Sequence, residues 1–117
     1  MKGYRDLIVW QKSISLVTFV YKITKTFPSE ELYGLSSQMR RSAVSIPSNI
    51  AEGSRRSTKK DFRHFLCIAF GSGAELETQL LIARNLGYGT EKEIVEIESL
   101  LNEIMKMLNT LRKSMCA

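Results

Sequence analysis

The sequence predicts an all-α protein: a single domain over residues 1–117, folded as an up-down-up-down antiparallel four-helix bundle. Three observations predict this fold. Apolar residues recur at alternating intervals of three and four along four segments, the chain has only two prolines, and the short breaks between the segments favour antiparallel neighbours. A core built from 117 residues is small, so association with further copies of the chain is expected.

The first helix is expected at about residues 7–26, with Asp6 as its N-cap. Because the residue before a proline is disfavoured in the α conformation, the helix ends near Phe27. Two sides of this segment are apolar, which indicates that it buries more than one face. The main stripe comprises Leu7, Trp10, Ile14, Val17 and Tyr21, and it is widened by Ile8, Leu16, Val20 and Ile23.

The second helix is expected from Glu30 or Leu35 to Gly53, since Gly34 can separate a short turn from the main helix. Its inner side carries small residues, which let helix backbones approach closely. Pro47 removes one backbone hydrogen bond inside this helix, so we predict a kink there. The residues of the inner side are Leu35, Met39, Ser42, Ile46, Asn49 or Ile50, and Gly53.

The third helix is expected at about residues 58–86, with Ser57 or Thr58 as its N-cap. Gly71 and Gly73 lie in its middle, where each glycine costs about 1 kcal/mol relative to alanine. The spacing of a phosphate-binding loop is missing, so we interpret these glycines as a site of close packing against a neighbouring helix. The apolar stripe comprises Phe62, Leu66, Ala69, Gly73, Leu76, Leu80 and Ala83.

The fourth helix follows a glycine-rich break at residues 87–89. Thr90 and Glu93 have the spacing of a capping box at its start, and it should run to about Ser114. The glutamates outside its apolar stripe are interpreted as a solvated face. The stripe comprises Ile94, Ile97, Leu101, Ile104, Leu108, Leu111 and Met115.

The net charge of +5 comes from one part of the chain, because residues 40–63 hold seven basic residues and only two acidic ones. Such a cluster predicts a phosphate-bearing partner, most simply structured RNA or another nucleic acid. No aromatic platform is interleaved with it, so recognition through shape and backbone is favoured over base reading. The alternative is a solvated basic end without a ligand. The candidate residues are Arg55, Arg56, Lys59, Lys60 and Arg63.

The residue pattern indicates no enzyme, cofactor or metal site. His64 is the only histidine, and it is interpreted as a surface or packing residue. Cys67 is expected to be buried in its helix and Cys116 exposed, as free thiols in a reducing compartment. We find no signal-peptide pattern near Met1 and no apolar run of about 18–20 residues, so a cytoplasmic protein without membrane contact is expected.

Four stretches resemble the four-helix-bundle family encoded by intervening sequences in bacterial 23S ribosomal RNA genes. The main one is residues 34–53, which contain the specific string SIPSNIAEG. The others are DLIVWQK at 6–12, FPSE at 27–30 and GSGAELETQL at 71–80, so the resemblance covers most of the chain. Gly73 departs from it, because that position often carries a bulkier residue.

The resemblance implies a homopentamer of bundles around a central channel. It also implies a fold similar to the basic accessory protein of diversity-generating retroelements, which partners a reverse transcriptase and nucleic acid. Two hypotheses follow: a non-enzymatic oligomer that binds RNA or other nucleic acid, and a structural oligomer that docks an acidic protein such as a reverse transcriptase-like partner. Polar contacts within the assembly are assigned to Arg40, Arg41, Asn49, Glu52 and Glu75.

Overall fold

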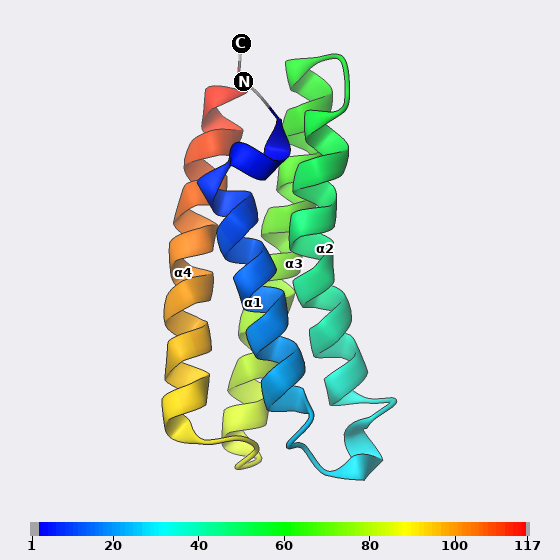
Figure 1. Cartoon of the computed structure of the whole chain (residues 1–117), viewed down its shortest axis with the longest axis vertical. Coiled ribbons are helices and arrows are strands. Elements are labelled where there is room, and N and C mark those ends of the chain that lie inside the picture. The colour runs from blue at the N-terminus through cyan, green and yellow to red at the C-terminus, as the bar shows by residue number, and fades with distance from the viewer. Residues whose placement is uncertain (1–2, 117) are drawn as a thin grey trace.

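The computed structural model describes residues 3–116 and has four long helices, which confirms the all-α class and the number of helices (Figure 1). No strand occurs within that range. The helices are α1 (Ile8–Thr24), α2 (Leu35–Ser54), α3 (Lys59–Asn85) and α4 (Glu91–Ser114). Two short 3-10 helices precede α1 and α2, namely η1 (Tyr4–Asp6) and η2 (Ser29–Glu31).

The four helices lie side by side along the long axis of a body that measures 45 × 24 × 21 Å. Each helix packs against two others, in the cyclic order α1, α2, α3, α4. The α1–α2 and α3–α4 connections lie at one end of the bundle (Figure 1). The α2–α3 connection lies at the other end, together with η1 and the last turn of α4. Three segments that are far apart in sequence therefore meet at that end.

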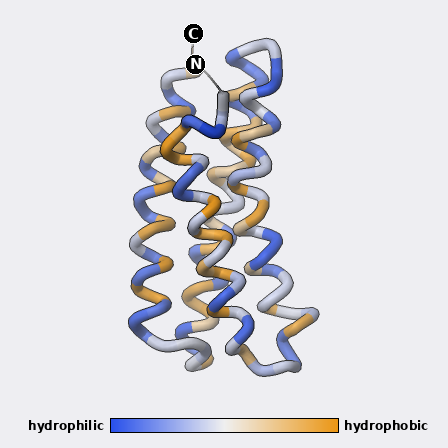
Figure 2. Tube along the Cα trace, viewed as in Figure 1, coloured by the Kyte–Doolittle hydropathy of each residue, from blue (hydrophilic) through white to orange (hydrophobic). Residues whose placement is uncertain are grey.

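The predicted stripes of α3 and α4 form the core. All seven residues of the α3 stripe are buried, as are the first five of the α4 stripe. Leu111 and Met115, near the end of α4, are half-buried. On α2, Ile50 rather than Asn49 completes the inner side. Figure 2 shows apolar segments that recur along each helix, as the alternating spacing predicts.

The stripe predicted for α1 is buried only in part. Leu7, Trp10 and Val17 are half-buried against the core, and Leu16, Val20 and Ile23, which were expected to widen the stripe, are buried as predicted. Ile14 and Tyr21 are 41% and 39% exposed, whereas the buried apolar residues are Val9, Leu16, Val20 and Ile23. The buried side of α1 also carries two polar residues, which interrupt its apolar pattern. Ser13 and Thr24 are buried, and their hydroxyls donate to backbone carbonyls of their own helix at 2.7 Å. Part of the predicted stripe instead lines open grooves between α1 and α2.

The helix ends follow the sequence signals, except at the N-terminal end of α1. Asp6 lies in η1 and does not cap α1, whose N-cap is Leu7, without a side-chain hydrogen bond. Gly34 separates η2 from α2, and α2 continues through Pro47. Thr58 caps α3, since its side chain accepts from the Asp61 N–H at 3.1 Å.

The connection between α3 and α4 is defined by two local motifs. Gly87 has a φ of 76°, and the N–H of Tyr88 donates to the Ala83 carbonyl at 2.9 Å, which is the closing pattern of a Schellman motif. The Thr90 hydroxyl then accepts from the Glu93 N–H at 3.1 Å, while the Glu93 carboxylate accepts from the Thr90 N–H at 3.0 Å. This confirms the capping box.

Two expectations about α3 need correction. Cys67 is exposed rather than buried, because the core takes the opposite side of the helix. By length and composition α3 is also apolar enough to cross a membrane, contrary to the expectation that no segment of the chain is. Such a composition is shared by core helices, and the apolar stripe of α3 from Phe62 to Ala83 packs into the bundle.

Candidate nucleic-acid interface

The α2–α3 connection is tight because Gly53 has no side chain. Gly53 is buried, and a Cβ atom there would lie 2.8 Å from the Phe65 Cβ and 2.9 Å from the Phe62 Cδ1. Its absence lets the first turns of α3 pack directly on the last turn of α2. Since the inner side of this corner is filled by Phe62, the basic residues around it are forced toward solvent.

The structure brings all five predicted basic residues together at this end. Arg55, Arg56, Lys59 and Lys60 are exposed. Arg63 is half-buried, and its Nη1 lies 3.4 Å from the Cys116 Sγ. Lys59 and Lys60 have no ion-pair partner within residues 3–116, and Arg55 and Arg56 remain exposed although each contacts an aromatic ring.

Two of the arginines are held in place by aromatic rings. The guanidinium of Arg55 lies 5.6 Å from the centre of the Tyr4 ring, and that of Arg56 lies 5.0 Å from the centre of the Phe65 ring. Arg56 also lies 3.5 Å from the Glu52 carboxylate, but this exposed pair is weak. A ring that contacts one face of a guanidinium does not by itself occupy the N–H groups, which can bind a phosphate in a bidentate manner.

Further basic residues lie at the same end and were missed in the sequence. Arg5 and Lys113 are exposed there. Arg112 stacks on Phe70 at 4.5 Å, and its Nη2 donates to the Asn109 Oδ1 at 2.6 Å. The topology could have predicted their position, because both chain ends of an antiparallel four-helix bundle lie beside the α2–α3 connection.

We call this surface the basic end. Its charge is uneven: among residues 3–116 it has eight basic side chains against three acidic ones. The glutamates of the first turns of α4 lie toward the opposite end of a body 45 Å long, which is several times the screening length of about 8 Å at physiological salt. They therefore do not neutralise it. The basic members are Arg5, Arg55, Arg56, Lys59, Lys60, Arg63, Arg112 and Lys113, and the acidic ones are Asp6, Glu52 and Asp61.

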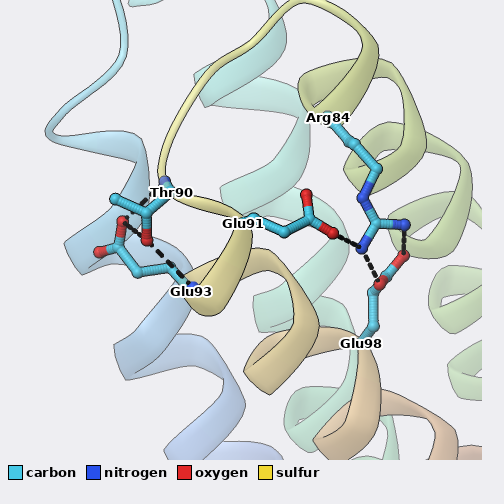
Figure 3. A network of polar contacts seen from close by, with 5 residues as sticks. All are labelled: Arg84, Thr90, Glu91, Glu93 and Glu98. Atoms are coloured by element: carbon cyan, nitrogen blue, oxygen red, sulfur yellow. Dashed lines mark hydrogen bonds and ion pairs between the residues drawn. The ribbon is translucent and has the colours of Figure 1, made fainter.

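The opposite end is closed by ion pairs around Arg84 (Figure 3). Its guanidinium donates to both carboxylate oxygens of Glu98, at 2.7 and 3.2 Å, and it lies 3.0 Å from Glu91. Nearby, the Tyr88 hydroxyl donates to the Glu31 carboxylate at 2.9 Å. This hydrogen bond raises the pKa of Tyr88 above its ordinary value, because a phenolate would face a carboxylate. The Tyr88–Glu31 hydrogen bond joins the α3–α4 connection to η2 in the α1–α2 connection, and the Arg84 ion pairs join α3 to α4.

The five residues assigned to contacts within an assembly are spread over the bundle. Arg40 contacts α1, where its Nε donates to the Thr24 Oγ1 at 2.9 Å. The Asn49 amide donates to the Ser45 carbonyl and hydroxyl at 2.8 and 2.9 Å. Glu52 belongs to the basic end. Arg41 and Glu75 are both exposed, and they line one groove between α2 and α3.

The described residues contain no group of three His, Cys, Asp or Glu side chains that could hold a metal ion. His64 is exposed and meets the Phe65 ring edge-on at 5.4 Å. What the arrangement can do chemically is present a group of fixed positive charges on a rigid helical end.

Fold and surface together define a small helical bundle with a cationic end. The model of the 23S rRNA-intervening sequence protein family matches residues 5–110, and the chain belongs to this family. It is similar to a protein of unknown function from the S23 ribosomal protein family of Bacteroides thetaiotaomicron VPI-5482, at 27% identity and a TM-score of 0.84. That match covers 91% of this chain and 99% of the other. No curated protein matches the chain.

Proposed function

We propose that the protein is a non-enzymatic, cytoplasmic oligomer whose basic end binds the phosphates of structured RNA or another nucleic acid. The observation that carries this proposal is the meeting of eight basic side chains, from three separate segments, on one end with three acidic ones. Phosphate contacts supply most sequence-independent affinity for nucleic acids. A homopentameric ring of antiparallel bundles would repeat the basic end five times, so that weak sites gain affinity through multivalency.

The salt dependence of binding to a fluorescein-labelled RNA hairpin tests this proposal. Because each phosphate contact releases counterions, log K should fall linearly with log salt concentration, and replacing one contacting lysine should reduce the slope by about one. The variant Lys59→Gln/Lys60→Gln should therefore lose about two units of slope. The matched control is Lys22→Gln/Lys25→Gln, two exposed lysines toward the other end of α1, which should behave as wild type. Equal slopes for all three proteins would refute the proposal.

A second candidate is a structural oligomer that docks an acidic protein partner. It is favoured by the open α1–α2 side, where Ile14, Tyr21 and Val44 are each about 40% exposed and Tyr33 is 94% exposed. Apolar side chains gathered on one side are typical of an association surface. Light scattering measures the oligomeric state independently of RNA binding. A monomer at micromolar concentration would contradict the homopentameric ring, whatever the RNA-binding assay shows.

A further inference from the structure

A groove between α1 and α2 lies outside the basic end, near the connection that joins these two helices (Figure 1). We call it the α1–α2 groove. Its volume is about 600 Å³, which is within the range of about 300–1,000 Å³ that is typical of small-molecule sites. Among residues 3–116 its lining combines cationic, aromatic and hydroxyl side chains with no acidic one. The lining includes Tyr21, Tyr33, Ser37, Arg40, Arg41 and Ser45.

The guanidinium of Arg40 is held in one orientation by two contacts with α1. Its Nε donates to the Thr24 Oγ1 at 2.9 Å, and its Cζ lies over the Tyr21 ring, 5.0 Å from the ring centre. The Thr24 hydroxyl donates its own proton to the Val20 carbonyl at 2.7 Å, so its lone pairs are available to Arg40. Because ordering of a long side chain opposes ligand binding, a guanidinium that the fold already orients binds an anion more tightly.

The same guanidinium has no anionic partner. Arg40 is half-buried, yet no carboxylate within residues 3–116 forms an ion pair with it, and its Nη atoms donate no hydrogen bond in that range. The Glu31 carboxylate is engaged elsewhere, because it accepts from the Tyr88 hydroxyl and the Leu35 N–H. Charges that leave water are normally paired. The two Nη atoms therefore remain available for two oxygens of a phosphate.

Tyr33, in the turn between η2 and α2, contributes an exposed aromatic ring to the groove. Its side chain is 94% exposed. Within residues 3–116 the ring takes part in no aromatic pair and no cation–π contact. Nucleobases of every kind stack on such a surface, because each base has a π face. The groove thus offers a flat binding surface in addition to its cations.

A nucleotide matches both features, because it joins a phosphate to a flat base through a short sugar. Arg40 and the exposed Arg41 are complementary to the phosphate, and the Ser37 hydroxyl in the same lining can contact the sugar. An apolar protein surface is a poorer match. A docked partner of that kind would bury the Arg40 guanidinium without a counter-charge, which is strongly unfavourable.

We propose that the α1–α2 groove is a nucleotide-binding site, in which Arg40 and Arg41 bind the phosphate and Tyr33 stacks on the base. The site is separate from the basic end, since Arg40 precedes Arg55 by about 22 Å along α2. The nucleotide is either free in solution or an unpaired nucleotide of an RNA strand, and both sources present the same chemistry. The inference does not depend on RNA binding by the basic end.

Fluorescence titration with 2-aminopurine riboside monophosphate tests the site, because stacking on an aromatic ring quenches this base. Quenching should be saturable with the wild-type protein. Arg40→Gln should weaken binding at least about tenfold, and Tyr33→Ser at least about fivefold, whereas Tyr33→Phe should stay within about twofold of wild type. Since Arg40 also contacts α1, the 94% exposed Tyr33 provides the variant that leaves the fold intact. The matched control is Arg55→Gln, which removes another arginine that lies over a tyrosine ring but is outside the groove, and it should behave as wild type.

Three results would overturn the inference: no saturable quenching by the wild-type protein, wild-type affinity of Tyr33→Ser, or equal affinity for the monophosphate and its phosphate-free nucleoside. A tetraribonucleotide that carries the same fluorescent base distinguishes the two sources. Binding at least about tenfold tighter than that of the monophosphate supports an RNA strand as the ligand, and equal binding supports a free nucleotide.

Binding of the RNA hairpin is measured in parallel, so that this inference and the proposed function can fail separately. Tyr33→Ser should lose quenching and keep hairpin binding, because Tyr33 lies outside the basic end. The variant Lys59→Gln/Lys60→Gln should show the reverse, with quenching retained and hairpin binding weakened. Loss of both activities in both variants would contradict the assignment of two separate sites.

Discussion

Gly71 and Gly73 are two residues apart on α3 and should respond in opposite ways to alanine. Gly71 is exposed, and a Cβ atom there would have no neighbour within 4 Å. A Cβ atom at Gly73 would lie 2.1 Å from the Sδ atom of Met105 on α4. This close approach confirms the packing role that the glycine pair suggested, and it assigns that role to Gly73 alone.

The expected energies follow from these distances. Alanine gains about 1 kcal/mol over glycine in a helix, so Gly71→Ala should stabilise the protein by about that amount. At Gly73 the sulfur atom must retreat by about 1.5 Å to reach ordinary contact distance. Overpacking of a core costs about 1–3 kcal/mol. Subtracting the helix gain leaves Gly73→Ala less stable than wild type by about 1 kcal/mol, and less stable than Gly71→Ala by about 2 kcal/mol.

Urea unfolding, followed by the helical circular-dichroism signal, measures these free energies of unfolding. The control uses Met105→Ala, which removes the obstructing sulfur. In that background Gly73→Ala should stabilise the protein, with a coupling energy of about 2 kcal/mol between the two positions. If Gly73→Ala stabilises the wild-type protein as much as Gly71→Ala does, the Met105 side chain moves aside without a cost in free energy. Close packing would then not be the reason for a glycine at position 73.

Three further predictions concern the end of the bundle opposite to the basic end. Thr90→Ala removes the capping box of α4 and should lower the free energy of unfolding by about 1 kcal/mol in urea titrations; no change would contradict the role of the cap. Glu98→Gln should destabilise by about 1 kcal/mol and Glu91→Gln by less than about 0.5 kcal/mol, because the Glu91 side chain is 71% exposed and that of Glu98 only 37%; equal losses would contradict this ranking. The pKa of Tyr88 is raised above 10.0 in the folded state, so its contribution to stability is complete below that pH and is lost as pH rises through the folded pKa. Tyr88→Phe should therefore lose less stability than wild type when urea midpoints are compared between neutral and strongly alkaline pH, and parallel curves would count against the Tyr88 hydrogen bond.

The predictable part of the candidate site was the part encoded by neighbours in sequence. The five basic residues lie within nine consecutive positions, so their cluster is visible without a fold: Arg55, Arg56, Lys59, Lys60 and Arg63. Arg5, Arg112 and Lys113 lie at the two ends of the chain, and their place beside the cluster depends on how the helices are connected. The meeting of Arg41 and Glu75 in one groove likewise depends on how α2 and α3 pack together.

Apart from the start of α1, the sequence by itself determined where the helices lie and how they end, because helix periodicity, capping hydroxyls and glycine stops act over a few residues. It also determined the inner side of α3 and α4, which have one apolar stripe each. Only the tertiary structure decided which side of α1 is buried, since that helix has two apolar sides and its neighbours choose between them. The same is true of the basic end, because it is made of side chains from three segments that only packing brings together.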